Sequence, residues 1–240
     1  MIKLVNVNKS YGNVKAVNDI SIELKSGQIF GFLGPNGAGK TTTIKMMTGL
    51  LKPDSGTILI NNKDMKKNSI EAKKEFGYVP DSSGMFLRLT GTEYLNLVAD
   101  IYDVPSNERN KAVDELSEKF DIKNVLGNRI QSYSHGMRQK LAIIGSVLHE
   151  PNIWILDEPL TGLDPKASFA LKELMKQYAY NGKVVFFSTH ILEVAEKICD
   201  SVIVINKGKI LYNGEICHMN KSLSEDNSLE KMFLELTNDE

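Results

Sequence analysis

The 240-residue sequence contains only two cysteines, Cys199 and Cys217, and it has no long apolar run. Uninterrupted apolar stretches are as short as Val184–Phe187 and Val202–Ile205, whereas a membrane-spanning helix requires about 20 residues. Two cysteines cannot build a disulfide framework, and the first residues lack the apolar segment of a secretory signal. We therefore expect a protein of a reducing, cytoplasmic setting that does not cross a bilayer by itself.

Charge of neither sign is in excess. The 29 Lys and Arg residues and the 30 Asp and Glu residues give a formal net charge of -1, and 42% of the residues are hydrophobic. Lysines gather between Lys63 and Lys74, but Asp64 and Glu71 are interleaved with them, as on a solvated helix face. We expect a globular chain with a core of its own and no nucleic-acid partner.

Strand patterns of two kinds open the sequence. Residues 2–7 favour a strand, and apolar residues alternate with polar ones over 20–24, which predicts a half-exposed antiparallel sheet. Residues 28–33 (QIFGFL) are nearly all apolar, as expected for a buried strand of a parallel sheet. Further strands are predicted at 57–60, 76–80, 152–156, 183–188, 201–205 and 209–214, and helices at 41–50, 166–180, 192–197 and 229–236.

The pattern between residues 82 and 150 is mostly helical. Thr90 and Glu93 form a capping-box sequence, and apolar residues recur at helical spacing after them. Strands alternate with helices in the rest of the chain, which predicts a parallel sheet with crossover helices. We expect one domain over 1–216, with a helical subdomain inserted at about 82–150, and a C-terminal tail over 217–240.

A glycine-rich string, Gly34 to Thr41 (GPNGAGKT), lies between the strand predicted at 28–33 and the next helix. It matches GxxxxGK(S/T) in the strand-loop-helix context that confirms this phosphate-binding pattern. Its glycines let backbone N–H groups converge on phosphate oxygens at the positive end of a helix. The predicted phosphate-binding residues are Asn36, Gly37, Ala38, Gly39, Lys40, Thr41 and Thr42, with Lys40 at the β- and γ-phosphates and the Thr41 hydroxyl on magnesium.

Such a loop alone is compatible with an NTPase, a kinase or a GTPase. Asp157 and Glu158 follow the apolar residues 153–156, which would place Asp157 near a metal ion and Glu158 near a water that attacks the γ-phosphate. The guanine-reading string NKxD is missing, because NKDM at 62–65 and NKGK at 206–209 both depart from it. The sequence therefore argues against a GTPase.

Further motifs resemble those of the nucleotide-binding subunits of ATP-binding cassette transporters. Residues 133–140 (YSHGMRQK) resemble the LSGGQ signature of that family and lie just upstream of the Asp-Glu pair. Residues 160–164 (LTGLD) resemble the loop that follows the pair, and His190 stands where the family has its switch histidine. Tyr11 falls where the family places an aromatic residue under the adenine. The resemblance covers nearly the whole chain.

This resemblance implies roles for the same residues. Glu158 would be the general base, His190 would hold the attacking water and the γ-phosphate, and Asp157 would bind magnesium beside Thr41. ATP and Mg²⁺ are the implied cofactors. In the family two subunits pair head to tail, and each ATP is held by the P-loop of one subunit and by signature residues of the other, here Ser134, His135, Gly136 and Met137. Separate transmembrane permeases touch the helical lobe, here near residues 82–94.

The signature segment also has helix-start chemistry of its own. Ser134 precedes apolar residues at helical spacing, so we expect it to cap a helix whose N–H groups at Gly136 and Met137 form a second anion site. One chain would then carry two phosphate-binding helix starts.

Three residues depart from the family pattern. Asp81 replaces a glutamine that contacts magnesium, and as an anion it either binds the metal directly or withdraws from the phosphates. His135 replaces a glycine and Met137 a glutamine. We hypothesise that a partly protonated His135 imidazole faces the γ-phosphate.

The sequence as a whole predicts an α/β fold: a P-loop NTPase core with a parallel sheet, an antiparallel β subdomain and a helical subdomain. We expect an ATPase that powers a separate permease from the inner face of the cell membrane and that works as a homodimer. The YSHGM string and residues 229–237 are most similar to cassettes of drug, peptide or ion exporters. A cassette ATPase without a role in transport, and a regulatory module with little turnover, remain as alternatives, and a phosphate-release assay separates the second.

Overall fold

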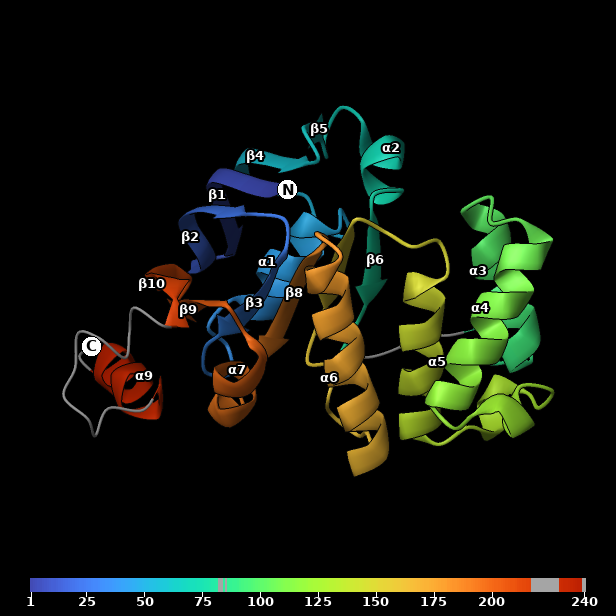
Figure 1. The fold of residues 1–240 in the computed structure, drawn as a ribbon. Helices are drawn as coiled ribbons and strands as arrows, with labels where there is room; N and C mark the ends of the chain where they lie inside the picture. Colours follow the sequence, from blue (N-terminus) through green and yellow to red (C-terminus); the bar gives the residue numbers. More distant parts are fainter. Residues whose placement is uncertain (82–83, 85, 217–228, 239–240) are drawn as a thin grey trace.

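The computed structural model describes residues 1–81, 84, 86–216 and 229–238, which form two sheets with flanking helices (Figure 1). Residues 82, 83 and 85 of the expected permease contact, and residues 217–228 of the expected tail, lie outside the described residues.

The larger sheet has six strands in the order β10-β9-β3-β8-β7-β6. They are β3 (Gln28–Leu33), β6 (Phe76–Val79), β7 (Ile153–Leu156), β8 (Val184–Thr189), β9 (Ser201–Asn206) and β10 (Lys209–Glu215). All neighbours pair in parallel except β10, which folds back antiparallel on β9. One face of the sheet packs on α5 (His135–Val147) and α6 (Pro165–Tyr180) and the other on α1 (Lys40–Met47) and the smaller sheet, so β7, β8 and β9 are buried along their whole length. The predicted parallel core and closing hairpin are confirmed.

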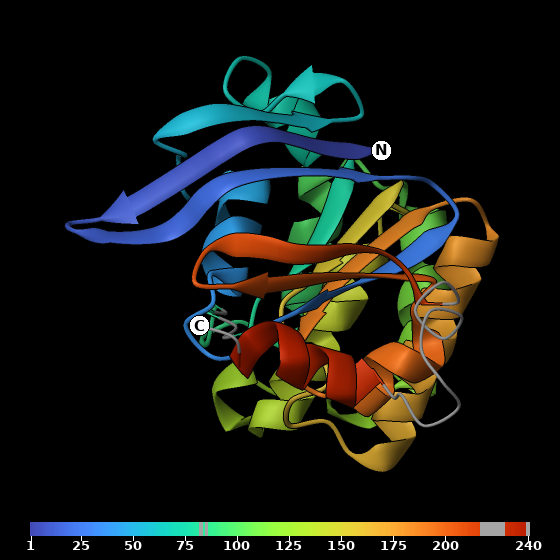
Figure 2. The ribbon, with the colours of Figure 1, turned by 90° about the vertical axis from the view of Figure 1, so that its left-hand side faces the viewer.

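A smaller antiparallel sheet lies over the first, as Figure 2 shows in blue and cyan. It comprises β1 (Ile2–Tyr11), β2 (Val14–Leu24), β4 (Ser55–Ile60) and β5 (Lys63–Asp64), in the order β2-β1-β4-β5. Its inward side chains, among them Ile2 and Leu24, form one apolar cluster with Met46 of α1 (Lys40–Met47) and Phe32 of β3. The predicted antiparallel layer is therefore confirmed, and it closes over the first helix of the core.

The remaining helices flank the larger sheet. They are α2 (Ser69–Lys73), α3 (Gly91–Ile101), α4 (Ser106–Lys119), α5 (His135–Val147), α6 (Pro165–Tyr180), α7 (Leu192–Ile198) and α9 (Leu229–Asn238), with 3-10 turns η1 (Lys123–Val125) and η2 (Ile130–Ser132). Thr90 and Glu93 form the predicted capping box at the start of α3. In the parts of the chain that are described, no helix is both long and apolar enough to cross a membrane.

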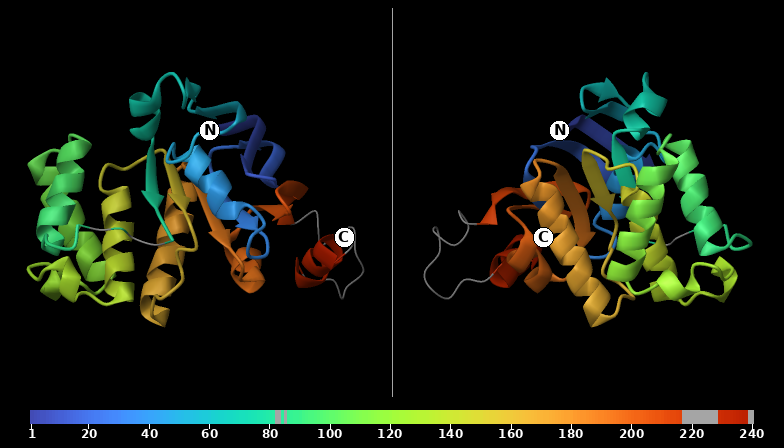
Figure 3. Two further views of the ribbon diagram at one scale, coloured as in Figure 1. Left: turned by 180° about the vertical axis from the view of Figure 1, so that it is seen from behind. Right: turned by 45° about the vertical axis from the view of Figure 1, so that its right-hand side comes forward.

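The helices from α3 to α5 share a core with the larger sheet. Leu95 of α3 and Ile144 of α5 belong to the same buried cluster as Trp154 of β7 and Leu171 of α6. The Trp154 indole N–H donates to the Ser146 hydroxyl of α5 at 2.9 Å. In both views of Figure 3, α5 lies between α6 and the α3–α4 pair. Helix α5 is therefore the element through which the helical segment is joined to the sheet.

Helix α9 packs on α7 at the opposite end of the molecule from α3 and α4 (Figure 1). Leu229 is buried with Leu33 of β3 and Val202 of β9. The helix predicted at 229–236 is thus present, and its apolar side covers the end of the parallel sheet.

His149 follows α5 and stacks on Tyr102 at the end of α3. The ring centroids are 3.6 Å apart and the rings are 10° from parallel. Burial lowers the pKa of His149 from 6.5 to about 4, against a backbone hydrogen bond with Phe76 and with a smaller contribution from the charge of Lys183. The neutral imidazole is therefore the form that fits between the two helices.

We predict that acid destabilises the chain through His149. A base whose pKa is lower in the folded chain stabilises it above the unfolded pKa, and that contribution is lost as the pH falls from 6.5 toward 4. The free energy of unfolding should drop by about 1–2 kcal/mol more between pH 7 and pH 5 in the natural chain than in His149→Phe, which keeps the ring stack without the titration. Urea titrations at both pH values measure this, and an equal drop in the two proteins would contradict it.

Candidate functional site

The glycine-rich loop connects the buried strand β3 to α1. Gly39 has a φ of +110° immediately before the helix, and a Cβ there would lie 2.4 Å from the carbonyl oxygen of Ala16. A side chain is therefore excluded by backbone conformation and by space. This keeps the loop tight against the β2 segment and leaves the first N–H groups of α1 directed at the loop, where an anion is favoured.

Lys40 begins α1 and its side chain is 7% exposed. Its ammonium donates to the carbonyl oxygens of Gly34 at 2.7 Å and Pro35 at 3.3 Å, and it lies 3.8 Å from a Glu158 carboxylate oxygen. Burial lowers the pKa of Lys40, while Glu158 and Asp157 oppose the shift. A buried ammonium with one carboxylate nearby is ready to pair with a further anion, such as a phosphate.

A cavity of about 360 Å³ opens above this loop. Most of the residues predicted from the sequence for nucleotide and metal binding line it. Its lining comprises Ala16, Pro35, Asn36, Gly37, Gly39, Lys40, Thr41, Thr42, Asp81, Glu158, Thr161 and His190. The carboxyl ends of parallel strands meet at one edge of a sheet, which is why the loops after β3, β6, β7 and β8 converge here.

Asp157 and Glu158 leave the end of β7 in different directions. Asp157 is 1% exposed, and the Glu158 side chain is 16% exposed. Burial raises the pKa of Asp157, against the hydrogen bonds of the Ser188 and Thr41 hydroxyls. Glu158 has a φ of +47°, a left-handed conformation that is strained for this residue. This turn aims its carboxylate into the cavity instead of along the strand.

Ser188 of β8 holds both acidic residues. Its hydroxyl donates to Asp157 Oδ1 at 2.6 Å and accepts from the Glu158 N–H at 2.9 Å. His190 follows Ser188 by two residues, and its Nδ1 lies 3.0 Å from Glu158 Oε2. The carboxylate pair and the histidine therefore form one connected group at the ends of β7 and β8.

The donor set around Asp157 suits a magnesium ion. Asp157 Oδ2 is buried and lacks a hydrogen-bond partner in the described part of the chain, an arrangement that a ligand or ion normally completes. The Thr41 hydroxyl and the Asp81 carboxylate are the nearby oxygen groups. Carboxylate and hydroxyl oxygens, with phosphate and water, are the ligands that Mg²⁺ prefers. These residues therefore fit the metal.

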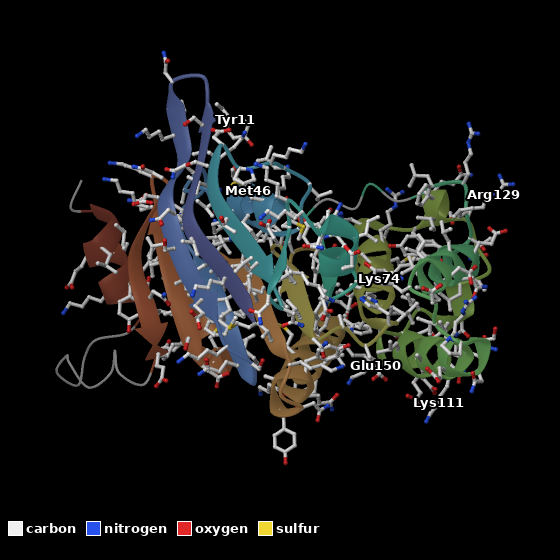
Figure 4. All side chains as sticks on the ribbon, turned by 90° about the horizontal axis from the view of Figure 1, so that it is seen from above. Tyr11, Met46, Lys74, Lys111, Arg129 and Glu150 are labelled. Carbon is white, nitrogen blue, oxygen red and sulfur yellow. The ribbon has the colours of Figure 1, made fainter. Side chains whose placement is uncertain are left out.

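Two predicted ATP-binding residues lie apart from the cavity lining. Ala38 is buried, 3% exposed, and contributes only backbone to the loop. Tyr11 is 52% exposed at the end of β1, near the tip of the β1–β2 hairpin in Figure 4, with the Lys9 ammonium 5.9 Å from its ring centre. Conversely, Ala16, Thr161 and Ser188 were not predicted. Ser188 has a sequence signal as a polar residue at the end of an apolar strand, and Thr161 lies in the 160–164 segment that the resemblance indicated.

The predicted second helix start is present but lies away from the cavity. Ser134 caps α5, its hydroxyl accepting from the Met137 N–H at 3.2 Å. Arg138 braces the preceding turn by donating to the carbonyl oxygens of Ile130 and Gln131. Ser134 and His135 are exposed, and neither lines the cavity above the glycine-rich loop. The chain therefore carries two anion-ready helix starts that do not face one another.

Comparisons with known proteins agree with this geometry. Residues 17–161 match the family described as ABC transporter, a span that runs from within β2 through Glu158 to Thr161. The chain belongs to the ABC transporter family. It is accordingly a transporter ATP-binding subunit and an ATPase, with the α/β cassette fold that the sequence predicted.

Individual cassettes resemble this chain over most of its length. The bacitracin transport ATP-binding protein BcrA of Bacillus licheniformis is 37% identical over 92% of this chain and 72% of its own length. A solved ATP-binding subunit of an ABC transporter has a TM-score of 0.93 at 31% identity, covering 98% of this chain and 99% of that one. A dimeric ATP-binding cassette in a post-hydrolysis state with ADP and Pi has a TM-score of 0.81 at 25% identity, covering 90% and 99%.

We predict that Ser188→Ala slows ATP hydrolysis by about tenfold or more, because both acidic residues of the cassette lose their shared partner. Ser146→Ala is a matched control, since this buried serine also donates one hydrogen bond and accepts one, from Trp154, but far from the cavity. Phosphate release and thermal unfolding of both variants separate the effects. Both should unfold at lower temperature, and equal kcat values in the two variants would contradict the prediction.

Proposed function

We propose that two copies of this chain pair head to tail around two ATP molecules and use their hydrolysis to drive export through a separate membrane permease. The site residues predicted from the sequence carry the binding and the chemistry. Magnesium accompanies each ATP.

The observation that carries the pairing is the separation of the two helix starts. The start of α1 lines the cavity together with Glu158, whereas Ser134, His135, Gly136 and Met137 at the start of α5 do not. A γ-phosphate in the cavity would therefore receive the N–H groups and helix dipole of α5 only from a second copy. The solved cassette with ADP and Pi is itself dimeric, which supports this arrangement. Association and ATP binding are then one linked event.

In this proposal the α1 side of the cavity binds the triphosphate. The backbone N–H groups of residues 36–42 surround the phosphate oxygens, and the Lys40 ammonium pairs with the β- and γ-phosphates. Tyr11 stacks on the adenine from the edge of the hairpin. Because Lys40 is held by two backbone carbonyls, it needs little rearrangement to meet the phosphates.

Thr41 and Asp157 would hold the magnesium ion, and Asp81 faces the same place. These residues would hold the ion where it would supply neutralisation of the charge on the β- and γ-phosphates. The buried Asp157 carboxylate gains a partner for Oδ2, which the described chain does not supply. Ser188 engages Oδ1, so Oδ2 is the oxygen that would remain for the ion.

Glu158 is the general base of the proposed reaction. A water attacks the γ-phosphorus, the bond to the bridging oxygen of ADP breaks, and Glu158 accepts the proton of the attacking water. His190, whose Nδ1 lies 3.0 Å from the Glu158 carboxylate, keeps the water and the γ-phosphate in register. ADP and phosphate are the products, and their formation reopens the pair.

We predict that Glu158→Gln still binds ATP but turns over at least about 100-fold more slowly, because the amide cannot accept the proton. The variant should accumulate as a dimer in ATP, which gel filtration with multi-angle light scattering measures. Glu196→Gln, an exposed change on α7, is the control and should resemble the natural chain. Turnover of Glu158→Gln at the natural rate would remove this residue from the mechanism.

The permease is proposed to dock beside α3. A groove of about 280 Å³ lies between the helical segment and the core, and its lining includes Leu50, Tyr78, Tyr94 and His149. Leu50 at its edge is 64% exposed, and Phe86, which precedes α3, is 62% exposed. Phe86 and Tyr94 belong to the range 82–94 that the resemblance assigns to permease contact, and Leu50 lines the same groove as Tyr94. A protein segment that covers them gains apolar burial.

We predict that Phe86→Asp releases the chain from membranes, weakening its attachment by about tenfold or more. Phe169→Asp is a matched control, because Phe169 is 65% exposed but lies on α6, away from the groove. Cells that express each variant are fractionated, and the chain is quantified in the membrane pellet. Purified Phe86→Asp should keep its ATP hydrolysis. Equal membrane fractions for the two variants would contradict docking at this surface.

The proposed location and direction follow from the partner. A chain that reaches the membrane through its permease would lie on the cytoplasmic face, where ATP is available. Export is supported by the resemblance of YSHGM and the C-terminal residues to exporter cassettes and by the relative that is named for bacitracin transport. Substrate selection is assigned to the permease.

A further inference from the structure

The first turns of α5 pack against the segment that follows Glu158 in the same chain. We call residues 159–164 the 159–164 loop. It connects Glu158 to Asp164, which caps α6 by accepting from the Ala167 N–H at 2.9 Å. Its Thr161 lines the nucleotide cavity and donates its N–H to the Glu158 carbonyl oxygen at 3.2 Å. The placement of this loop therefore sets the placement of Glu158.

The His135 side chain lies directly against Gly162 in the middle of the loop. A Cβ built on Gly162 would lie 2.4 Å from His135 Cδ2 and 2.9 Å from Nε2, so the imidazole occupies the space that a side chain at position 162 would need. The backbones are equally close beside it, because a Cβ on Gly136 would lie 2.6 Å from the Gly162 carbonyl oxygen. The His135 ring therefore packs directly on the Gly162 backbone, which has no side chain.

Two further side chains of α5 hold the ends of the same loop. The Gln139 amide, 2% exposed, donates to the Pro159 carbonyl oxygen at 3.3 Å. The Lys140 ammonium lies 2.6 Å from an Asp164 carboxylate oxygen. His135 is the contact at the middle, so its ring decides where the loop lies between these two anchors.

We propose that His135 is a positioning residue for hydrolysis, which acts by packing its ring on Gly162 of its own subunit and not by placing an imidazolium against a phosphate. The ring holds the 159–164 loop, the loop holds Glu158 and Thr161, and these face the nucleotide. The backbone N–H groups at the start of α5 keep the phosphate-binding role given above. The inference rests on the proposed role of Glu158 as general base.

Substitutions at position 135 separate packing from charge. His135→Phe keeps a ring of similar size without a titratable nitrogen, and we expect a kcat within about twofold of the natural value with an unchanged pH profile. His135→Gly should lower kcat by about fivefold or more and leave KM for ATP nearly unchanged. If His135→Phe loses as much activity as His135→Gly, or if KM carries the loss, the charge of the imidazole matters and the proposal fails.

Substitutions at position 162 test the contact from the other side. Gly162→Ala should displace the ring and lower kcat about as much as His135→Gly does, and the double variant should be little worse than either single one. Gly182→Ala is the control for backbone strain, because Gly182 has a φ of +76°, close to the +78° of Gly162, but has nothing within 4 Å of an added Cβ. Additive losses in the double variant, or an equal kcat loss in Gly182→Ala, would overturn the contact.

Hydrogen-deuterium exchange provides a readout that does not depend on turnover. Peptides that cover the 159–164 loop should exchange faster in His135→Gly and Gly162→Ala than in the natural chain. In His135→Phe their exchange rate should equal that of the natural chain. Equal exchange in all four proteins would overturn the proposal. If instead the exchange pattern holds but Glu158→Gln hydrolyses ATP at the natural rate, the role of Glu158 fails and the packing of His135 stands.

Discussion

The hydrogen bonds of one hydroxyl group hold the reacting end of this molecule together. Parallel pairing sets Leu156 of β7 opposite Phe187 of β8, so the next residues lie side by side, Asp157 just past the end of β7 and Ser188 still within β8. Two adjacent carboxylates in a buried place would repel one another, and without Ser188 the Asp157 carboxylate would lose a hydrogen bond that favours its charged form. Ser188 satisfies one oxygen of Asp157 and the Glu158 N–H together. The apolar strands, crossover helices and antiparallel layer keep that register.

Helix α5 joins three parts of the chain that act together. Its buried face packs with α3 and with the sheet, its first turn contacts the 159–164 loop, and its exposed start is one of the two anion-ready helix ends. A force on the helical segment would therefore reach the loop beside Glu158 through a rigid element instead of a flexible linker. This continuity gives a physical route by which a partner beside α3 influences ATP turnover.

Local patterns predicted most of the fold and much of the site. Buried strands such as 153–156, the capping box at Thr90 and the cap at Ser134 depend on neighbouring residues, and all three are present. The contacts of Ala16 with Gly39 and of Gly162 with His135 join segments distant in sequence, so no local pattern indicated them. For His135 the residue type suggested charge, but only the packing of α5 on the 159–164 loop showed where the ring lies.

At Glu158 the requirements of folding and of catalysis conflict, because the left-handed conformation disfavours the side chain that the reaction needs. A φ of +47° costs a residue with a Cβ about 1 kcal/mol or more, a cost that glycine would not bear. The chain keeps a carboxylate there although another residue would fold more easily. Selection for thermal stability alone would therefore drift away from the active protein at this position, and a library screened only for folding would enrich inactive variants.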